Sequence, residues 1–417
     1  MRRWTLDVES PTVSATLAQP RGRILYVQYT NAAAYPPLEH SSQILASRGW
    51  QVLFAGIGGR GTASLTFPPF PRIQSQTLNW CAPGFLQKLH YAEFCIWVSW
   101  LSFYWRPDWI YCSDPLSAVP GHLATLWAKA RVLYHEHDSP GPLGARDNWF
   151  ARYIARQRGF LIETADAVVL PNQKRLDAVT WIHPPKGHTF CVWNCPSVTD
   201  FQGSLSSKRL DGTLRVLYHG TIVPERFPMR MLQALADCKS DVTIRLIGYE
   251  VPGCLGYAAS LQAEAARLGV SDRFEYLGTI PLRSDLMARA AECQVGLSLL
   301  NHRSEDINMR HMVGASNKPF DYLSQGLVLI VPEEPEWRAL YVDHGCALAC
   351  EPNDAAALAA LFSWMSDHRA EVREMGRRGR SLIESTWNYE TQFTPVVQLL
   401  ESSIKDRQKA SISSPKT

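Results

Sequence analysis

Short apolar segments alternate with helical segments along most of this 417-residue chain, and this alternation restricts the possible folds more than any other feature. Strands separated by helices of about 10–20 residues are typical of parallel, doubly wound α/β sheets. The predicted strands of the first half are residues 23–29, 51–55, 109–112, 131–134, 167–170 and 190–193, and those of the second half are residues 214–218, 242–247, 274–277, 295–300 and 327–331.

The chain is too long for one ordinary hydrophobic core, so we expect two domains. Residues 197–213 are rich in glycine and serine, which is typical of a linker. We therefore expect one Rossmann-like domain over residues 1–196 and a second over residues 214–400. Residues 401–417 are polar, and we expect a disordered tail there. Two such domains that face each other across a cleft would place a ligand at the carboxyl ends of their strands.

The composition argues against several classes of function. The net charge of +3, from 42 basic and 39 acidic residues, is too small to support nucleic-acid binding. The ten cysteines form no Cys-x-x-Cys pair and have no histidines at zinc-finger spacing, so we expect reduced thiols in a cytoplasmic protein. The first residues lack the apolar core of a signal peptide. We also expect no metal site, because no Asp-x-Asp cluster is placed to bind Mg²⁺ or Mn²⁺.

Aromatic residues are concentrated in the first half, and 11 of the 14 tryptophans lie at or before Trp193. Residues 94–105 are uncharged, but about 18 Å of helix is too short to cross the roughly 30 Å hydrocarbon core of a bilayer. This helix and the arginines that follow could contact an anionic membrane from the cytoplasmic side. Alternatively, the helix packs on the sheet and the arginines form a solvated face. The arginines are Arg146, Arg152, Arg156 and Arg158, interleaved with Trp149, Phe150 and Tyr153.

Glycine-containing loops follow four predicted strands of the second half. Gly220 permits a tight turn and a close approach to a ligand, and Arg226 offers a rigid guanidinium to phosphate. A surface arginine in an ordinary loop is the simpler interpretation of that motif alone, but four such loops in strand order favour a binding edge. The candidate donor-binding residues in the loops after the first three of these strands are Gly220, Thr221, Gly248, Gly278 and Ile280.

The segment from residue 314 to residue 326 is the most informative of these loops. A helix is expected to begin after Ser316 and to end at Gly326, before an apolar strand. A helix N-terminus has free N–H groups and partial positive charge, which suit a diphosphate. A carboxylate one to two turns further along can accept hydrogen bonds from sugar hydroxyls. This chemistry suits a nucleotide-sugar site, with candidates Gly314, Ser316, Asn317, Lys318 and Asp321.

Titratable side chains also follow a strand of the first half, from His135 to Asp138. Loops at strand ends often contain catalytic residues, so we expect His137 to lie near the reacting atoms. The alternative is that His135 or His137 only caps the following loop. Asn31, in the loop after the first strand, and Asp138 are further candidate site residues.

From about residue 215 to residue 398, the chain resembles the nucleotide-sugar domain of family 4 retaining glycosyltransferases, which have the GT-B fold. The family pattern Gly-Arg-x₄-Lys corresponds here to Gly220, Thr221 and Arg226. Arg226 thus takes the place of the lysine that binds the diphosphate, and Thr221 replaces the usual arginine. In the first half, the family pattern Val-Tyr-Asp-x-His-Glu aligns its active-site histidine with His137 and the acid after it with Asp138. The resemblance implies that Asn31 and Asp138 lie on the acceptor side.

The family motif Glu-x₇-Glu corresponds to Val313 through Asp321. Asp321 matches the acid that contacts the nucleotide ribose, whereas Val313 replaces the acid that normally touches the donor sugar. The sequence from Ser316 to Tyr322 is similar to the variant found in bacterial surface-polysaccharide transferases. That similarity implies that Asn317 and Lys318 lie beside the phosphates.

The resemblance implies transfer of a sugar from a nucleotide diphosphate-sugar to a hydroxyl acceptor, with retention at the anomeric carbon and without a metal or other cofactor. The acceptor is expected to be lipid-linked or a growing polysaccharide, and the candidate catalytic residues are His137, Arg226 and Lys318. Two alternatives stay open. One is a nucleotide-sugar epimerase, and the other is a non-catalytic GT-B binding or assembly subunit that lost activity with the first acid.

Overall fold

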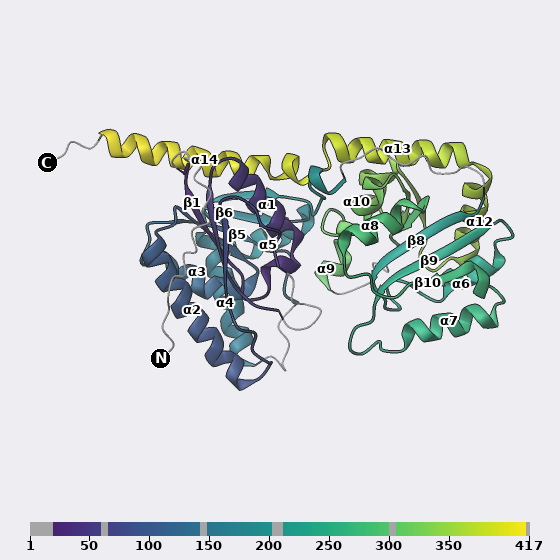
Figure 1. Cartoon of the computed structure of the whole chain (residues 1–417), viewed down its shortest axis with the longest axis horizontal. Coiled ribbons are helices and arrows are strands. Elements are labelled where there is room, and N and C mark those ends of the chain that lie inside the picture. The colour runs from purple at the N-terminus through teal and green to yellow at the C-terminus, as the bar shows by residue number, and fades with distance from the viewer. Residues whose placement is uncertain (1–19, 60–65, 142–147, 202–211, 300–305, 414–417) are drawn as a thin grey trace.

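The computed structural model describes residues 20–59, 66–141, 148–201, 212–299 and 306–413, which form two lobes (Figure 1). The first lobe contains a 7-stranded parallel sheet with the strand order β3-β2-β1-β4-β5-β6-β7. This order is that of a doubly wound Rossmann-like sheet. The strands are β1 (Arg23–Val27), β2 (Gln51–Ile57), β3 (Ile73–Leu78), β4 (Trp109–Ser113), β5 (Arg131–His135), β6 (Ala167–Leu170) and β7 (His188–Cys191).

Helices cover both faces of the first sheet. Side chains from α2 (Phe85–Trp105), α3 (Ala118–Thr125), α4 (Trp149–Thr164) and α5 (Gln173–Ile182) pack with apolar strand residues on one face. On the other face, α1 (Pro36–Ser47) packs beside the C-terminal helix α14 (Tyr389–Ser413). Short 3₁₀ segments are η1 (Ala32–Ala34), η3 (Pro115–Ser117), η4 (Val198–Phe201) and η5 (Ser271–Arg273).

The second lobe contains a 6-stranded parallel sheet with the order β10-β9-β8-β11-β12-β13. Its strands are β8 (Leu214–Thr221), β9 (Val242–Tyr249), β10 (Phe274–Tyr276), β11 (Val295–Leu297), β12 (Val328–Pro332) and β13 (Ala347–Cys350). Side chains of α6 (Arg230–Asp237), α7 (Tyr257–Arg267) and α12 (Ala355–Asp367) cover one face, and those of α8 (Arg283–Ala291), α10 (Asn317–Ser324) and α13 (Arg369–Ser385) cover the other. The remaining helical segments are α9 (Ile307–Arg310), α11 (Pro335–Trp337) and the π-helical turn η6 (Arg338–Val342).

The predicted fold class is confirmed, because both halves are parallel, doubly wound sheets that face each other. Each predicted strand is present, with β7 shifted two residues toward the N-terminus. The sequence did not predict two edge strands, β13 and β3, and the residues of β3 are mostly polar and partly exposed. An edge strand of this kind lacks the continuous apolar run that marks a buried parallel strand. Within the described residues, no helix has both the length and the apolar character needed to cross a bilayer.

Helix α14 lies on the first lobe, although the sequence assigned residues up to 400 to the second domain (Figure 1). Phe393, Leu400 and Ile404 are buried against the first sheet, and Trp109 Nε1 of β4 donates a hydrogen bond to Ser403 Oγ at 2.9 Å. The helix continues past residue 401, where a disordered tail was predicted, because these apolar side chains recur at helical spacing. Residues 414–417 of that tail lie outside the described residues.

The chain passes between the lobes twice, and the two passages are bonded to each other. Tyr389 N–H donates to the Pro196 carbonyl at 3.0 Å. The Glu390 carboxylate accepts hydrogen bonds from Ser197 Oγ at 2.5 Å and from Val198 N–H at 3.1 Å. Most of the predicted linker, residues 202–211, lies outside the described residues.

The packing of α14 predicts that Leu400→Ala destabilises the first lobe by about 2–5 kcal/mol, because Leu400 is fully buried and its removal leaves a cavity. Urea unfolding followed by tryptophan fluorescence would measure the change. Ser402→Ala, at an exposed position of the same helix, is the control and should leave the unfolding midpoint unchanged. Equal midpoints for both variants would contradict the packing described for α14.

Candidate active site between the lobes

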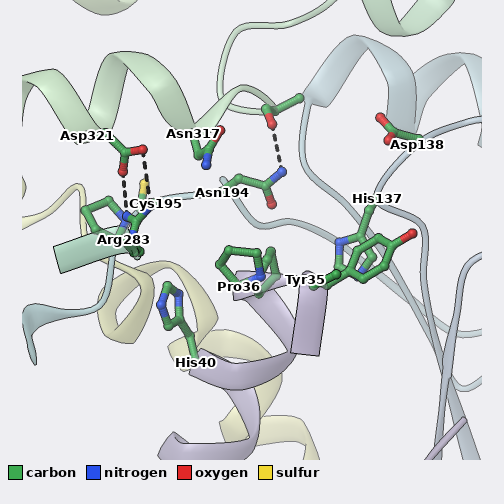
Figure 2. A pocket seen from close by; sticks show the side chains of 14 residues that line it. Tyr35, Pro36, His40, His137, Asp138, Asn194, Cys195, Arg283, Asn317 and Asp321 are labelled. Carbon is green, nitrogen blue, oxygen red and sulfur yellow. Dashed lines mark hydrogen bonds and ion pairs between the residues drawn. The ribbon is translucent and has the colours of Figure 1, made fainter. Parts of the chain in front are cut away.

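His137 follows β5 and lies in the interface between the lobes, beside Tyr35 (Figure 2). Its ring is buried, and neither ring nitrogen has a hydrogen-bond partner among the described residues. Burial lowers the pKa of His137, so the imidazole is neutral at physiological pH. A buried imidazole without partners can both donate to and accept from a ligand hydroxyl.

Asp114 fixes the backbone at His137, and the sequence did not single out this residue. Its Oδ1 accepts from His137 N–H at 2.9 Å, while its Oδ2 accepts from Gln28 Nε2 at 3.3 Å. Asp114 has a φ of 62°, a left-handed conformation that is unfavourable for a residue with a side chain. Burial raises its pKa, opposed chiefly by the nearby His137. A Ser-Asp-Pro turn at the end of β4 is the sequence signal that could have identified it.

Asp138 and Asn31, the predicted acceptor-side residues, line two different cavities. The Asp138 side chain lines the same cavity as His137, but it is 82% exposed and lies 3.9 Å from Arg175 Nη1. Asn31 caps η1 by accepting a hydrogen bond from Ala33 N–H at 3.1 Å. It lines a separate cavity of about 570 Å³ in the first lobe.

On the opposite lobe, helix α10 begins where the sequence predicted. Its N-cap residue, Ser316, makes no side-chain capping bond, so the side chain at the start of the helix does not occupy the free N–H groups. Gly314, two residues before Ser316, has a φ of 76°, and a Cβ there would lie 2.5 Å from Trp193 Cδ1 of the first lobe. Asn194 Nδ2 donates to the Ala315 carbonyl at 2.7 Å (Figure 2). The first lobe thus positions the start of α10 directly.

Val313, which occupies the position of the family's first acid, is buried in the apolar cluster of the second lobe. Its carbonyl accepts a hydrogen bond from Asn172 Nδ2 at 2.8 Å. Asn317 lines the interface cavity together with Ala315.

The side chain of Lys318 lies directly over Gly220 at the end of β8. A Cβ at Gly220 would lie 2.4 Å from Lys318 Cε, and Gly220 has a φ of 121°, so a side chain is excluded there on both grounds. Burial and, to a smaller extent, the positive charge of Arg226 lower the pKa of Lys318 to about 7, against the opposing effect of Asp321. An anion placed beside this amine would favour its charged form.

Arg226 follows β8 and reaches toward α9, where its Nη2 lies 3.7 Å from Met309 Sδ. Among the described residues, no carboxylate lies within ion-pairing distance of either Arg226 or Lys318. Helix α9 is itself joined to the first lobe, because the Asn308 side chain donates to Ser139 O at 2.7 Å and accepts from Ser139 N–H at 2.9 Å. The two cations therefore belong to the edge of the second lobe that meets the His137 loop.

Asp321 is almost completely buried, at 1% exposure, and forms a two-pronged ion pair with Arg283 of α8 (Figure 2). Arg283 Nη2 lies 2.7 Å from Asp321 Oδ1, and Nη1 lies 3.3 Å from Oδ2. The charge of Asp321 raises the pKa of Arg283. His219 Nε2 lies 3.7 Å from the same carboxylate, but burial lowers the pKa of His219 to about 4 and keeps it neutral. The sequence did not identify Arg283 or His219 as neighbours of Asp321.

The remaining predicted donor-binding residues come together at the carboxyl edge of β8, β9 and β10. Gly248 N–H donates to the Gly278 carbonyl at 2.9 Å, and a Cβ at Gly248 would lie 1.8 Å from the Gly220 carbonyl oxygen. Thr221 Oγ1 lies 3.5 Å from the hydroxyl of Tyr249. Ile280 packs against the apolar cluster under α10.

A cavity of about 180 Å³ lies between the lobes and contains only part of the predicted site. His137, Asp138, Asn317 and Asp321 line it, and Figure 2 shows how they surround it. Arg226, Lys318 and the glycine loops are not among its lining residues. Arg283 and His40, which the sequence did not predict, are also among its lining residues.

Comparison with known proteins gives a clear result for the fold. HepE from Anabaena, solved in complex with UDP-glucose, has a TM-score of 0.65 and 18% identity, over 91% of this chain and 100% of HepE. Sucrose-phosphate synthase from Thermosynechococcus elongatus has a TM-score of 0.67 and 16% identity, over 94% of this chain and 100% of the synthase. This chain has the GT-B fold. A glycosyltransferase from Rickettsia africae shares that GT-B architecture, with a TM-score of 0.69 and 12% identity over 92% of this chain and 99% of its own.

No protein-family model matches the chain, and no curated protein does either. At these identities, the GT-B neighbours establish the architecture alone, so the residue roles rest on the geometry described above.

The surroundings of Lys318 predict that its amine titrates near pH 7. Acetic anhydride acetylates only the neutral amine, so labelling of Lys318, read by peptide mass spectrometry, should be half-maximal near that pH. Arg226→Met removes a neighbouring positive charge, which raises the pKa and moves the labelling midpoint to higher pH. Arg230→Met, in the following helix, is the control and should not move it. A midpoint near the ordinary lysine value in the unmodified protein would contradict this description.

Proposed function

We propose that this protein is a retaining glycosyltransferase that moves a sugar from a nucleotide diphosphate-sugar to a hydroxyl acceptor. The observation that supports this most directly is that Asn317, at the uncapped start of α10, lines the same interface cavity as His137 of the other lobe. The second lobe presents Lys318, Arg226 and the uncapped start of α10, while the first lobe presents a neutral His137 with unpartnered ring nitrogens. Cations and amides suit a diphosphate, and a neutral imidazole suits sugar hydroxyls.

In this proposal, Lys318, Arg226 and the amides after Gly314 stabilise the negative charge that builds on the leaving diphosphate. They would supply the positive charge that a metal ion supplies in other transferases. His137 would hold the sugar near its reacting carbon. Gly220 and Gly248 would let the backbone approach the phosphates, and the loop from Gly278 through Ile280 would contact the nucleoside.

Retention is proposed because the sequence resembles family 4 retaining glycosyltransferases and because, apart from the exposed Asp138, the carboxylates described at the interface have protein partners. Asp321 is held by Arg283, and Asp114 is held by the His137 backbone and Gln28. The acceptor hydroxyl would attack the anomeric carbon on the face that the diphosphate leaves. Its proton would pass to the departing phosphate oxygen as the bond from carbon to that oxygen breaks.

The ion pair between Asp321 and Arg283 bears on nucleoside binding. A carboxylate has about four acceptor positions, so Asp321 can bind Arg283 and still accept from a ribose hydroxyl. We propose that Arg283 orients Asp321 for that contact. The acceptor would be a lipid-linked saccharide or a growing polysaccharide, used at the cytoplasmic face of a membrane.

The proposal predicts that Lys318→Met lowers both affinity for a nucleotide diphosphate and kcat/KM for transfer, the latter by about 10²–10³-fold. His137→Ala should lower kcat/KM by about 10²-fold or more, but should change nucleotide diphosphate affinity by less than about threefold, because His137 faces the sugar. Calorimetry with UDP, GDP and ADP and a coupled assay of diphosphate release would measure these effects. His188→Ala, at an exposed position on β7, is the control.

The same measurements separate the alternatives. Conversion of the donor to an epimer without any acceptor would identify an epimerase. Tight binding of a nucleotide diphosphate, with no donor consumed by the unmodified protein, would identify a non-catalytic subunit. Either result would reject the transferase proposal.

A further inference from the structure

Helix α2 is apolar on its outward side as well as on the side that packs on the first sheet. Phe94, Val98 and Leu101 are buried in the core of the first lobe. A helix that is apolar on all sides is normally enclosed by protein or lipid. The outward side of α2 is instead exposed over the whole length of the helix, at Phe85, Leu89, Ile96, Trp100 and Phe103, which recur at helical spacing.

The neighbouring helices extend this surface. The Phe103 ring contacts Trp127, just after α3, edge to face at 6.0 Å between ring centroids. Lys88 Nζ of α2 lies 5.1 Å from the Trp149 ring of α4. Figure 1 shows α2, α3 and α4 side by side on one side of the first lobe, away from α14. We call this surface the outer apolar face, and its members are Phe85, Leu86, Leu89, Ile96, Trp100, Phe103, Tyr104, Leu126, Trp127, Trp149, Tyr153 and Phe160.

The charges around the outer apolar face are predominantly basic. Arg152 and Arg156 are exposed on α4 and lie four residues apart, as do the exposed Trp149 and Tyr153 of the same helix. The third arginine of α4, Arg158, instead turns inward to the buried Glu136. Glu93 is the exposed acidic residue of α2. Aromatic rings bordered by arginine and lysine match the interface of an anionic bilayer, where rings lie at headgroup level and cations meet phosphate.

Three neighbouring cavities lie between the N-terminal end of α2 and the candidate active site. Phe85 and Lys88 line a cavity of about 410 Å³. That cavity shares Tyr29 with the cavity of about 570 Å³ that contains Asn31. The second cavity in turn shares Tyr35 with the interface cavity that contains His137. An acceptor that enters beside Phe85 would therefore meet a series of cavities leading toward the proposed sugar site.

We infer that the outer apolar face docks on an anionic lipid bilayer and that the cavities at the start of α2 receive a lipid-linked acceptor from that bilayer. The docking itself stands on the exposed side chains and their charges, whereas the acceptor route rests on the proposed function. Helix α2 lies in the plane of the membrane surface, its aromatic residues enter the headgroup region, and Arg152 and Arg156 contact lipid phosphates.

Cosedimentation with vesicles tests the docking without any donor or turnover. Binding to vesicles of phosphatidylcholine and phosphatidylglycerol should exceed binding to phosphatidylcholine alone, and it should weaken between about 0.1 M and 0.5 M salt. Ile96→Ser combined with Leu126→Ser, at sites 70% and 74% exposed, should weaken the partition by about tenfold or more. The matched control is Leu255→Ser combined with Leu282→Ser, at sites 76% and 62% exposed in the second lobe, and should bind as the unmodified protein does.

A charge reversal gives a second, independent variant. Arg152→Glu combined with Arg156→Glu should reduce binding to the anionic vesicles and leave the weak binding to neutral vesicles unchanged. Arg377→Glu combined with Arg378→Glu, on helix α13 of the other lobe, is its control. Thermal unfolding of every variant would show that folding is retained.

Several results would overturn the inference. One is absence of binding to anionic vesicles, and another is equal binding by the Ile96/Leu126 variant and its control. Self-association that the Ile96/Leu126 substitutions abolish, without vesicle binding, would assign the outer apolar face to a second copy of this chain. Each of these leaves the proposed sugar transfer standing, because transfer is measured separately. Conversely, vesicle binding without any donor consumption would reject the acceptor route and retain the docking.

Discussion

The buried guanidinium of Arg175 is the contact on which the geometry between the lobes depends. It lies on α5 of the first lobe and donates to the carbonyls of His311 at 2.8 Å and Asn308 at 2.7 Å, both in the second lobe. It also reaches the His137 carbonyl at 3.3 Å. One side chain thereby fixes the His137 loop relative to α9. Because a buried charge is costly without partners, these carbonyls and the guanidinium stabilise one arrangement of the lobes.

The environment of the two cations follows from this arrangement. Helix α9 places Met309 against Arg226. Asn172 and Asn194 hold the segment that leads into α10. Lys318 is partly buried, and both its burial and the positive charge of Arg226 disfavour the charged form of its amine. A site organised in this way interacts strongly with a polyanion, because the anion relieves the repulsion between the two cations.

The sequence predicted the architecture well, because parallel strands buried on both faces leave continuous apolar runs that periodicity detects. It also predicted the start of α10, where glycine and the helix pattern coincide. It did not predict the partner of Asp321, since Arg283 lies on another helix and only the tertiary fold brings them together. Asp114 was missed although a Ser-Asp-Pro turn marks its position, because its bond to the His137 backbone is formed only in the tertiary fold. The assignment of α14 differs because its apolar side chains pack on the first sheet, whose last strand ends at Cys191, far earlier in the chain.

The paired passages between the lobes restrict how the lobes can move. A single flexible connection would allow rotation about any axis. Here the segment at Pro196 and the start of α14 run together, joined by the bond from Tyr389 and by the contacts of Glu390. Because the two attachments are adjacent, the easiest motion of the lobes is bending about the line through both attachments. Opening and closing about this line would therefore move the start of α10 toward and away from His137 along a single path.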